Sequence, residues 1–238
     1  MRSYYILPII LIIFGIQGCV AIVTPFDSDD ASPVPIAESY ISLQSKGSFI
    51  RTFGSAVVIE DGWAVTNRHV VEKIDGMQGF MAGGRHFPVQ DAILSERLDL
   101  AVFRVPQGVG KPIPIGARIK KGDRIFSTGT TFSETLLEGV VVAPVFKFHH
   151  ADIILRDAPI KDEKGRSITQ GFVYEGDFIN GFSGGPVVNA VGELVGINQG
   201  RLIEVLSADA NQSFTSDKSY GLAYHIADAL IELQRLLP

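Results

Sequence analysis

The sequence contains a single cysteine in 238 residues, so no intrachain disulfide framework can stabilise its fold. It lacks a run of basic residues and its net charge is −5, which argues against nucleic acid as the main partner. It also lacks internal repeats of the kind that build solenoid proteins. With 46% hydrophobic residues, 25 glycines and 12 prolines, the composition is that of a globular protein that buries a full core.

The N-terminus carries an apolar run next to that cysteine. Arg2 precedes residues 4–16, a run of signal-peptide length that is short for a membrane span. Ile16-Gln17-Gly18-Cys19 resembles the signal of bacterial lipoproteins, in which the cysteine is lipidated and the chain is cut before it. The resemblance implies a signal peptide over residues 1–18 and a lipid anchor on Cys19.

Two alternatives to this anchor stay open. Residues 4–23 carry no charge and are long enough to span a bilayer as an uncleaved anchor, and simple secretion is the other alternative. Residues 19–35 are acidic and rich in proline and serine, which is typical of a flexible tether. We therefore expect a domain at residues 36–238 that is held in the bacterial cell envelope and faces the periplasm or the exterior, while inner or outer membrane stays open.

Short strand signals follow one another closely through this domain. Asp61-Gly62 is a strong hairpin turn signal between two of them. A Gly/Pro-rich crossing at residues 106–116 divides the strands into two sets. The predicted strands lie at residues 56–59, 63–66, 85–89 and 100–105 before the crossing, and at 124–127, 140–146, 152–155, 187–188 and 193–197 after it.

The last stretch has a helical period, because Ile226, Leu230 and Leu233 recur at spacings of four and three. Asp228 near its start and Arg235 near its end suit the helix dipole. Strands in two sets, closed by one helix, predict an all-β protein of two small barrels. We expect barrel one at about residues 36–110, barrel two at about 117–225 and the helix at about 226–237.

Residues 180–186 read Asn-Gly-Phe-Ser-Gly-Gly-Pro, and a serine flanked by glycines is typical of a nucleophile on a tight turn. Gly184 and Gly185 would let a substrate carbonyl come close. The N–H groups of Gly181 and Ser183 would then converge on a developing oxyanion. The alternative is an ordinary Gly/Ser-rich turn between strands.

Two other residues can serve this serine. His69 lies just beyond the strand at residues 63–66, and a histidine suits a general base near neutral pH. Asp99 directly precedes the strand at 100–105 and could accept the Nδ1–H of His69. Taken alone, His69 is a surface histidine and Asp99 a strand-start cap. Together with Ser183 they predict a catalytic triad that spans both halves of the chain.

Three motifs in this order resemble the chymotrypsin-type serine proteases, and most of all their bacterial Deg/HtrA-type branch. They are Thr-Asn-Arg-His-Val-Val at residues 66–71, Asp-Leu-Ala-Val at 99–102 and Ser-Gly-Gly-Pro-Val-Val-Asn at 183–189, supported by Gly54-Ser55 and by residues 192–198 and 220–224. The resemblance covers residues 54–237. It implies a double six-stranded β-barrel with a C-terminal α-helix and the active site between the barrels. It also implies that His69 is the base, Asp99 its orienting partner and Ser183 the nucleophile, with an oxyanion hole at Gly181, Phe182 and Ser183.

The sequence departs from this family pattern near the serine. Phe182 stands where digestive relatives carry an aspartate that pairs with a newly freed N-terminus, so we expect no activation of that kind. The segment at 179–183 is one residue shorter than the matching Deg/HtrA loop, which raises the hypothesis that Phe182 sits over the site and restricts access. We expect no PDZ-like module after the helix and carry over no oligomeric behaviour.

Two stretches are candidates for substrate binding. Asp177 lies six residues before Ser183, where trypsin-like relatives place a pocket-floor aspartate that binds arginine or lysine. An acidic surface loop is the alternative. Asn198, Gln199 and Gly200 occupy the stretch that in relatives lines the pocket wall and pairs with the substrate backbone, as a strand edge open to β-addition.

His149, His150 and Asp152 do not predict a metal site, because adjacent residues on a strand point to opposite faces. We expect no cofactor. The sequence therefore predicts a serine endopeptidase of the cell envelope that acts on proteins or peptides through an acyl-enzyme. The alternatives are a catalytically idle, lipid-anchored peptide-binding protein and an esterase that uses the same triad.

Overall fold

The computed structural model describes residues 36–45, 53–72, 76–81, 85–133, 143–161, 167–176, 178, 180–201 and 219–237. The lipoprotein-like signal with Cys19, the tether and Asp177 lie outside these residues, so the predictions made for them stay predictions. No helix among the described residues is long and apolar enough to cross a membrane.

The first half of the chain forms a curled antiparallel sheet of seven strands in the order β5-β4-β1-β2-β3-β7-β6. Two short helices accompany it, α1 (Ile36–Ser39) before β1 and α2 (Arg68–Val71) after β3. The strands are β1 (Tyr40–Ser45), β2 (Phe53–Glu60), β3 (Trp63–Thr66), β4 (Met77–Met81), β5 (His86–Pro88), β6 (Ile93–Leu94) and β7 (Ala101–Arg104).

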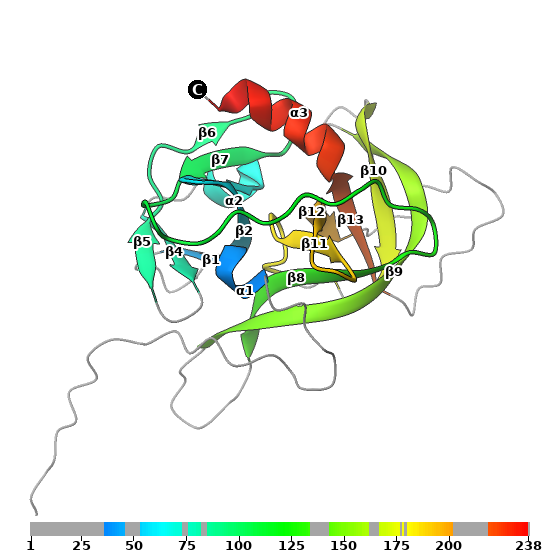
Figure 1. The fold of residues 1–238 in the computed structure, drawn as a ribbon, viewed down its shortest axis with the longest axis horizontal. Helices are drawn as coiled ribbons and strands as arrows, with labels where there is room; N and C mark the ends of the chain where they lie inside the picture. Colours follow the sequence, from blue (N-terminus) through cyan, green and yellow to red (C-terminus); the bar gives the residue numbers. More distant parts are fainter. Residues whose placement is uncertain are drawn as a thin grey trace, which may run out of the picture.

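The second half forms a closed antiparallel barrel in the order β10-β13-β12-β11-β8-β9. Helix α3 (Ile226–Leu236) follows β13 and contacts β12 and β7, so it covers one end of both sheets (Figure 1). The barrel strands are β8 (Arg124–Ser133), β9 (Ala143–Lys161), β10 (Ser167–Glu175), β11 (Pro186–Asn189), β12 (Leu194–Arg201) and β13 (Tyr220–His225).

This architecture confirms the predicted all-β, chymotrypsin-like double barrel with a C-terminal helix. The hairpin between β2 and β3 turns at Asp61-Gly62, and Gly62 has the positive φ of +78° that this turn requires. The barrel of the second half has the expected six strands, whereas the described part of the first sheet has seven because β5 and β6 add short strands at its two ends.

The strand predictions missed or divided several elements. Neither β1, β4 nor β10 was predicted, although each is paired on both sides. The described residues of the two strands expected at 140–146 and 152–155 lie on one strand, β9. The strand continues through the polar residues between them because β8 pairs with β9 over residues 143–152, and β10 takes over from residue 152 to residue 161.

A shared core joins the two halves. Tyr40, Val57 and Leu100 of the first half and Tyr224 of β13 belong to one buried cluster, against which α3 packs Leu233. This shared core fixes the relative position of the two sheets, and the segments at residues 66–69, 99 and 181–185 meet where they adjoin.

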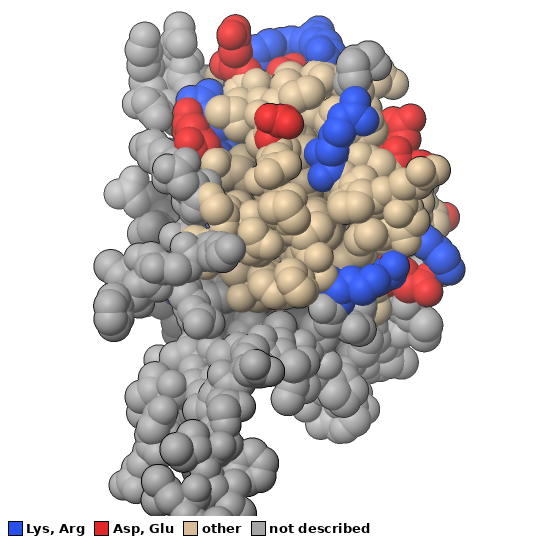
Figure 2. Space-filling model, turned by 90° about the vertical axis from the view of Figure 1, so that its left-hand side faces the viewer, with Lys and Arg blue, Asp and Glu red and all other residues tan. Residues whose placement is uncertain are grey.

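The surface seen in Figure 2 carries Lys, Arg, Asp and Glu side chains scattered around a mainly uncharged area. No continuous basic area covers the described part of this face.

Candidate active site

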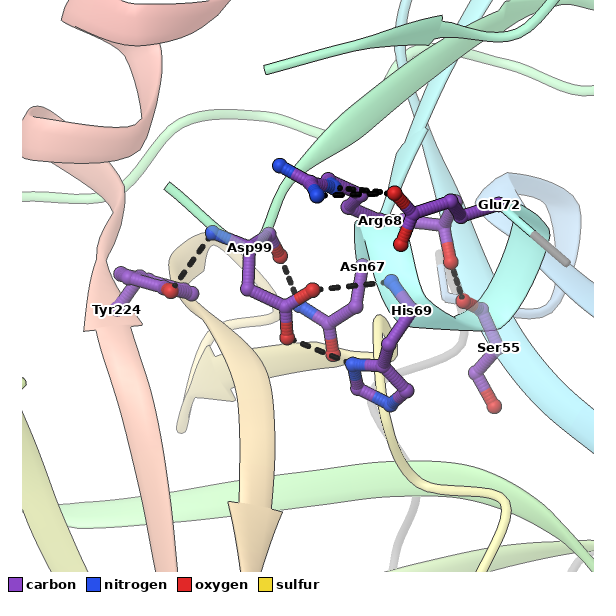
Figure 3. A network of polar contacts seen from close by, with 8 residues as sticks. Ser55, Asn67, Arg68, His69, Glu72, Asp99 and Tyr224 are labelled. Atoms are coloured by element: carbon purple, nitrogen blue, oxygen red, sulfur yellow. Dashed lines mark hydrogen bonds and ion pairs between the residues drawn. The ribbon is translucent and has the colours of Figure 1, made fainter. Parts of the chain in front are cut away.

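His69 and Asp99 form a two-point contact between α2 and the start of β7 (Figure 3). The distance from His69 Nδ1 to Asp99 Oδ2 is 2.6 Å, and the backbone N–H of His69 donates to Asp99 Oδ1 over 2.9 Å. A carboxylate at this distance holds Nδ1 protonated and leaves Nε2 free to accept a proton. The His69 side chain is 49% exposed, so this ring reaches the surface where a substrate would arrive.

Asp99 is itself held from both halves of the molecule. Asn67, just before α2, donates its Nδ2–H to the Asp99 carbonyl over 2.9 Å, and the backbone N–H of Asp99 donates to the Tyr224 hydroxyl of β13 over 3.1 Å (Figure 3). Burial raises the pKa of Tyr224, so this hydroxyl stays neutral. The carboxylate is therefore fixed in position by its own backbone.

Ser183 lies in the serine turn, which we define as residues 180–185, between β10 and β11. Its carbonyl accepts the N–H of Ser55 on β2 over 2.9 Å. Gly184 has a φ of +79°, and a Cβ there would lie 2.3 Å from the Ser55 carbonyl oxygen and 2.8 Å from Asn67 N. The serine turn thus packs directly against the residues that precede His69.

Within the described residues no hydrogen bond joins Ser183 Oγ to His69, although both side chains belong to segments in contact. Hydrogen bonds of this kind are often long until a substrate closes the site.

The carbonyl groups of the serine turn are tied back into the protein. The carbonyl of Gly181 accepts the Ser55 hydroxyl over 2.7 Å, and that of Phe182 accepts the N–H of Gly185 over 2.8 Å. A trans peptide points its N–H away from its carbonyl, so the Ser183 N–H faces away from Gly185. Neither Gly181 N–H nor Ser183 N–H has an acceptor among the described residues. Both remain available for an oxyanion.

The Phe182 side chain corrects one expectation. It is fully buried and packs on Phe178 with ring centroids 5.8 Å apart. On its other side it lies so close to Gly129 that a Cβ there would fall 2.3 Å from the Phe182 ring. The hypothesis that Phe182 covers the site is wrong. The positive φ of Gly181, +102°, turns the chain so that the apolar ring enters the barrel core.

Asn198, predicted to line a substrate pocket, is fully buried, and its side chain and both backbone groups are hydrogen-bonded within the protein. Its Oδ1 accepts the Tyr174 hydroxyl over 2.7 Å, and its Nδ2 donates to the Thr128 carbonyl over 3.1 Å. Its backbone carbonyl accepts Gly184 N–H, and its N–H donates to the Gly185 carbonyl, both over 2.9 Å. Asn198 therefore supports the serine turn from behind.

Gln199 and Gly200 are half-buried and lie at a register shift in the pairing of β12 with β13. Their role in binding a substrate backbone stays a prediction.

The residues expected not to bind metal are only partly described. His150 packs against the ring of Phe126 with centroids 4.9 Å apart, and the His149 side chain lies outside the described residues. The described residues contain no group of three or more His, Cys, Asp or Glu side chains placed to hold a metal ion.

Sequence reasoning missed the residues that support this site. Ser55 and Tyr224 entered only as parts of the motif matches at residues 54–55 and 220–224, and Tyr40 and Thr130 carried no signal of their own. All of them act through contacts between residues far apart in sequence, which a single sequence does not reveal.

The trypsin-like peptidase domain family matches residues 54–197. Over 240 aligned residues the chain is 31% identical to the serine endoprotease DegS of Escherichia coli (strain K12), covering 89% of this chain and 62% of DegS. The chain thus spans less than two thirds of that relative.

Solved structures share the fold. The serine endoprotease of Yersinia pestis superposes with a TM-score of 0.60 at 22% identity, covering 85% of this chain and 64% of that one. The Rv3671c protease in its inactive form gives a TM-score of 0.63 at 20% identity, covering 85% of this chain and 91% of that one. These structures show that the fold is shared, and the family match over residues 54–197 together with the similarity to DegS shows that the chain belongs to the trypsin-like peptidase domain family, in the Deg/HtrA branch of the chymotrypsin-type serine proteases.

Proposed function

We propose that this protein is a serine endopeptidase that hydrolyses peptide bonds through Ser183, His69 and Asp99. The observation that carries the proposal is the two-point contact of Asp99 with His69, at 2.6 Å to Nδ1 and 2.9 Å to the backbone N–H. This contact orients the imidazole and fixes its tautomer, which is the role of the carboxylate in a triad. The names of the relatives as serine endoproteases support the same activity.

In the proposed mechanism, His69 Nε2 accepts the proton of Ser183 Oγ as the oxygen attacks the substrate carbonyl carbon. Asp99 stabilises the imidazolium that results. The N–H groups of Gly181 and Ser183 donate to the developing oxyanion, usually a large contribution in acyl transfer. His69 then protonates the leaving amine, and a water molecule activated by the same histidine hydrolyses the acyl-enzyme. No cofactor takes part in these steps.

A fluorophosphonate probe tests this proposal on the full-length protein in detergent. We expect wild type to be labelled, and we expect Ser183→Ala and His69→Ala, each shown to be folded by circular dichroism, to lose labelling. A folded wild type without labelling would overturn the proposal.

The same experiment distinguishes the proposed protease from the main alternative, a catalytically idle peptide-binding protein, which the probe would not label. That alternative rested on the short loop and on Phe182 covering the site, and Phe182 is buried in the core instead. The esterase alternative is tested with matched ester and amide substrates, because amide turnover would exclude a purely esterolytic enzyme.

We further propose that Cys19 carries a lipid anchor that holds the domain in the bacterial envelope, where it acts on proteins or peptides. The support is the sequence of residues 16–19, which resembles a lipoprotein signal. Cys19→Ser should block both lipid attachment and cleavage. An unchanged mass and unchanged membrane partition of that variant would contradict the anchor.

A further inference from the structure

Ser55 on β2 contacts the serine turn twice, from the opposite barrel. Its hydroxyl donates to the Gly181 carbonyl over 2.7 Å, and its backbone N–H donates to the Ser183 carbonyl over 2.9 Å. Its own carbonyl accepts the Thr66 hydroxyl over 2.7 Å. Ser55 is fully buried. One residue therefore joins both ends of the Gly181-Phe182-Ser183 tripeptide to the strand that leads to His69.

Two more buried residues direct the Ser55 hydroxyl. The backbone N–H of Thr130 on β8 donates to Ser55 Oγ over 3.1 Å, and the Tyr40 hydroxyl of β1 lies 2.7 Å from the same oxygen. Tyr40 also contacts Thr130 Oγ1. Tyr40 and Thr130 are 5% and 2% exposed, so water does not compete for these bonds.

The direction of each bond follows from what each group can do. A carbonyl only accepts, so the single Ser55 hydroxyl proton goes to Gly181. The Thr130 N–H only donates, so Ser55 Oγ accepts from it and, with its second lone pair, from the Tyr40 hydroxyl. Tyr40 in turn accepts from the Thr130 hydroxyl. Donation therefore runs from Thr130 through Tyr40 and Ser55 to the Gly181 carbonyl, an arrangement in which successive bonds strengthen one another.

The pKa of Tyr40 is raised because burial disfavours its charged form, so the tyrosine keeps its proton for this contact. The hydrogen-bond network from Thr130 to Gly181 therefore carries no charge at neutral pH.

We propose that Ser55 is a positioning residue that holds the serine turn in the orientation that presents the Gly181 and Ser183 N–H groups, and that Tyr40 and Thr130 fix its hydroxyl. The inference rests on the proposed function. In this proposal, the contact between the barrels preorganises the oxyanion hole. Preorganised donors stabilise the transition state more than they strengthen substrate binding.

The test compares Ser55→Ala with a matched control in the full-length protein. Ser42 lies directly opposite Ser55 in the β1–β2 register and is 8% exposed. Its hydroxyl accepts from Gln44 Nε2 rather than bonding to the serine turn. We expect Ser55→Ala to lower kcat for a peptide substrate roughly 10- to 100-fold with little change in KM, since losing one oxyanion donor outright costs about 100- to 1000-fold. Ser42→Ala should keep the wild-type kcat.

Tyr40→Phe serves as the second variant, and it decides the question if Ser55→Ala does not fold. It removes one donor to Ser55 but leaves the Ser55 hydroxyl and the ring in place. We expect a smaller fall in kcat, about 3- to 10-fold, again at constant KM. Binding of a peptide aldehyde, which forms a tetrahedral adduct, should weaken in parallel with kcat, while binding of a cleaved product peptide should not change.

The outcomes separate the two proposals. Absence of labelling in the folded wild type would overturn the proposed function. A labelled wild type with unchanged kcat in the folded variants would overturn the positioning role of Ser55. An equal loss in Ser42→Ala, or a loss expressed in KM alone, would overturn it as well, because both indicate a general effect on packing. Restored kcat in Ser55→Thr, which keeps the hydroxyl, would support it.

Discussion

The two sides of the candidate site are built differently. On the base side, His69 is half exposed and rests on one carboxylate, which is 25% exposed. On the nucleophile side, Gly181 and Phe182 are buried and every carbonyl from Gly181 to Ser183 has a donor within the protein. A base must exchange protons with substrate and water, whereas an oxyanion hole works best when its donors cannot reorient. The difference in burial matches the difference in task.

The largest effect should come from removing the nucleophile itself. Ser183→Ala should reduce kcat about 10⁶-fold, because the oxyanion donors and substrate binding alone leave only a small residual rate. Turnover of a fluorogenic peptide measures the loss. A variant that retains more than about one per cent of wild-type activity would place the nucleophile elsewhere.

Asp99→Asn removes the negative charge beside His69 but keeps the size and shape of the side chain. An amide at this position favours the wrong tautomer of His69, so kcat should fall about 10⁴-fold. The variant should still bind a peptide aldehyde, since the serine turn is untouched. Glu72→Gln is the control, because it removes a charge from a residue that bonds to Arg68 and not to His69. An equal loss of kcat in this control would show that the effect is not specific to Asp99.

Phe182→Ala tests the nucleophile side through packing. Removing a fully buried phenylalanine from a core costs about 3–5 kcal/mol of unfolding free energy. We expect kcat to fall as well, because the serine turn loses its inner support. Phe178→Ala is the control, since this residue packs on Phe182 but lies before the turn. If Phe178→Ala loses a comparable amount of stability but less kcat, the loss of kcat in Phe182→Ala comes from the serine turn. Identical kcat values in the two variants would contradict this.

The smallest effect concerns stability alone and lies away from both sides. Burial is the main cause that lowers the pKa of His225, whose Nε2 lies 2.7 Å from the Arg156 carbonyl. The unfolded chain therefore binds a proton more readily than the folded one below about pH 6.5. Stability should fall as the pH drops from about 6.5 towards the folded pKa, with a slope of at most about 1.4 kcal/mol per pH unit from this group.

Urea unfolding between pH 5 and pH 8 measures this slope. His225→Phe should flatten it, and an unchanged slope in that variant would contradict the assignment to His225.

The sequence predicted those parts of the molecule that depend on local pattern. The turn at Asp61-Gly62, the amphipathic helix α3 and the fold class follow from residues close together or from motifs in a fixed order. The direction of the Phe182 side chain did not, because it depends on the backbone of Gly181 and on the space left by Gly129. The inward position of Asn198 depends on its hydrogen bonds to Tyr174 and Thr128, which are 24 and 70 positions away in the sequence, and the contact of Ser55 with Gly181 joins residues 126 positions apart.

The contact between Ser55 and the serine turn has a consequence for the newly made chain. Residues 55, 69 and 99 are synthesised well before residue 183, and the Tyr224 hydroxyl that holds Asp99 comes later still. A chain with only its first sheet formed therefore has a histidine and a carboxylate but no nucleophile and no anchored oxyanion donors. Under the proposed mechanism, the full catalytic arrangement is therefore present only after the second barrel has formed and docked on the first sheet.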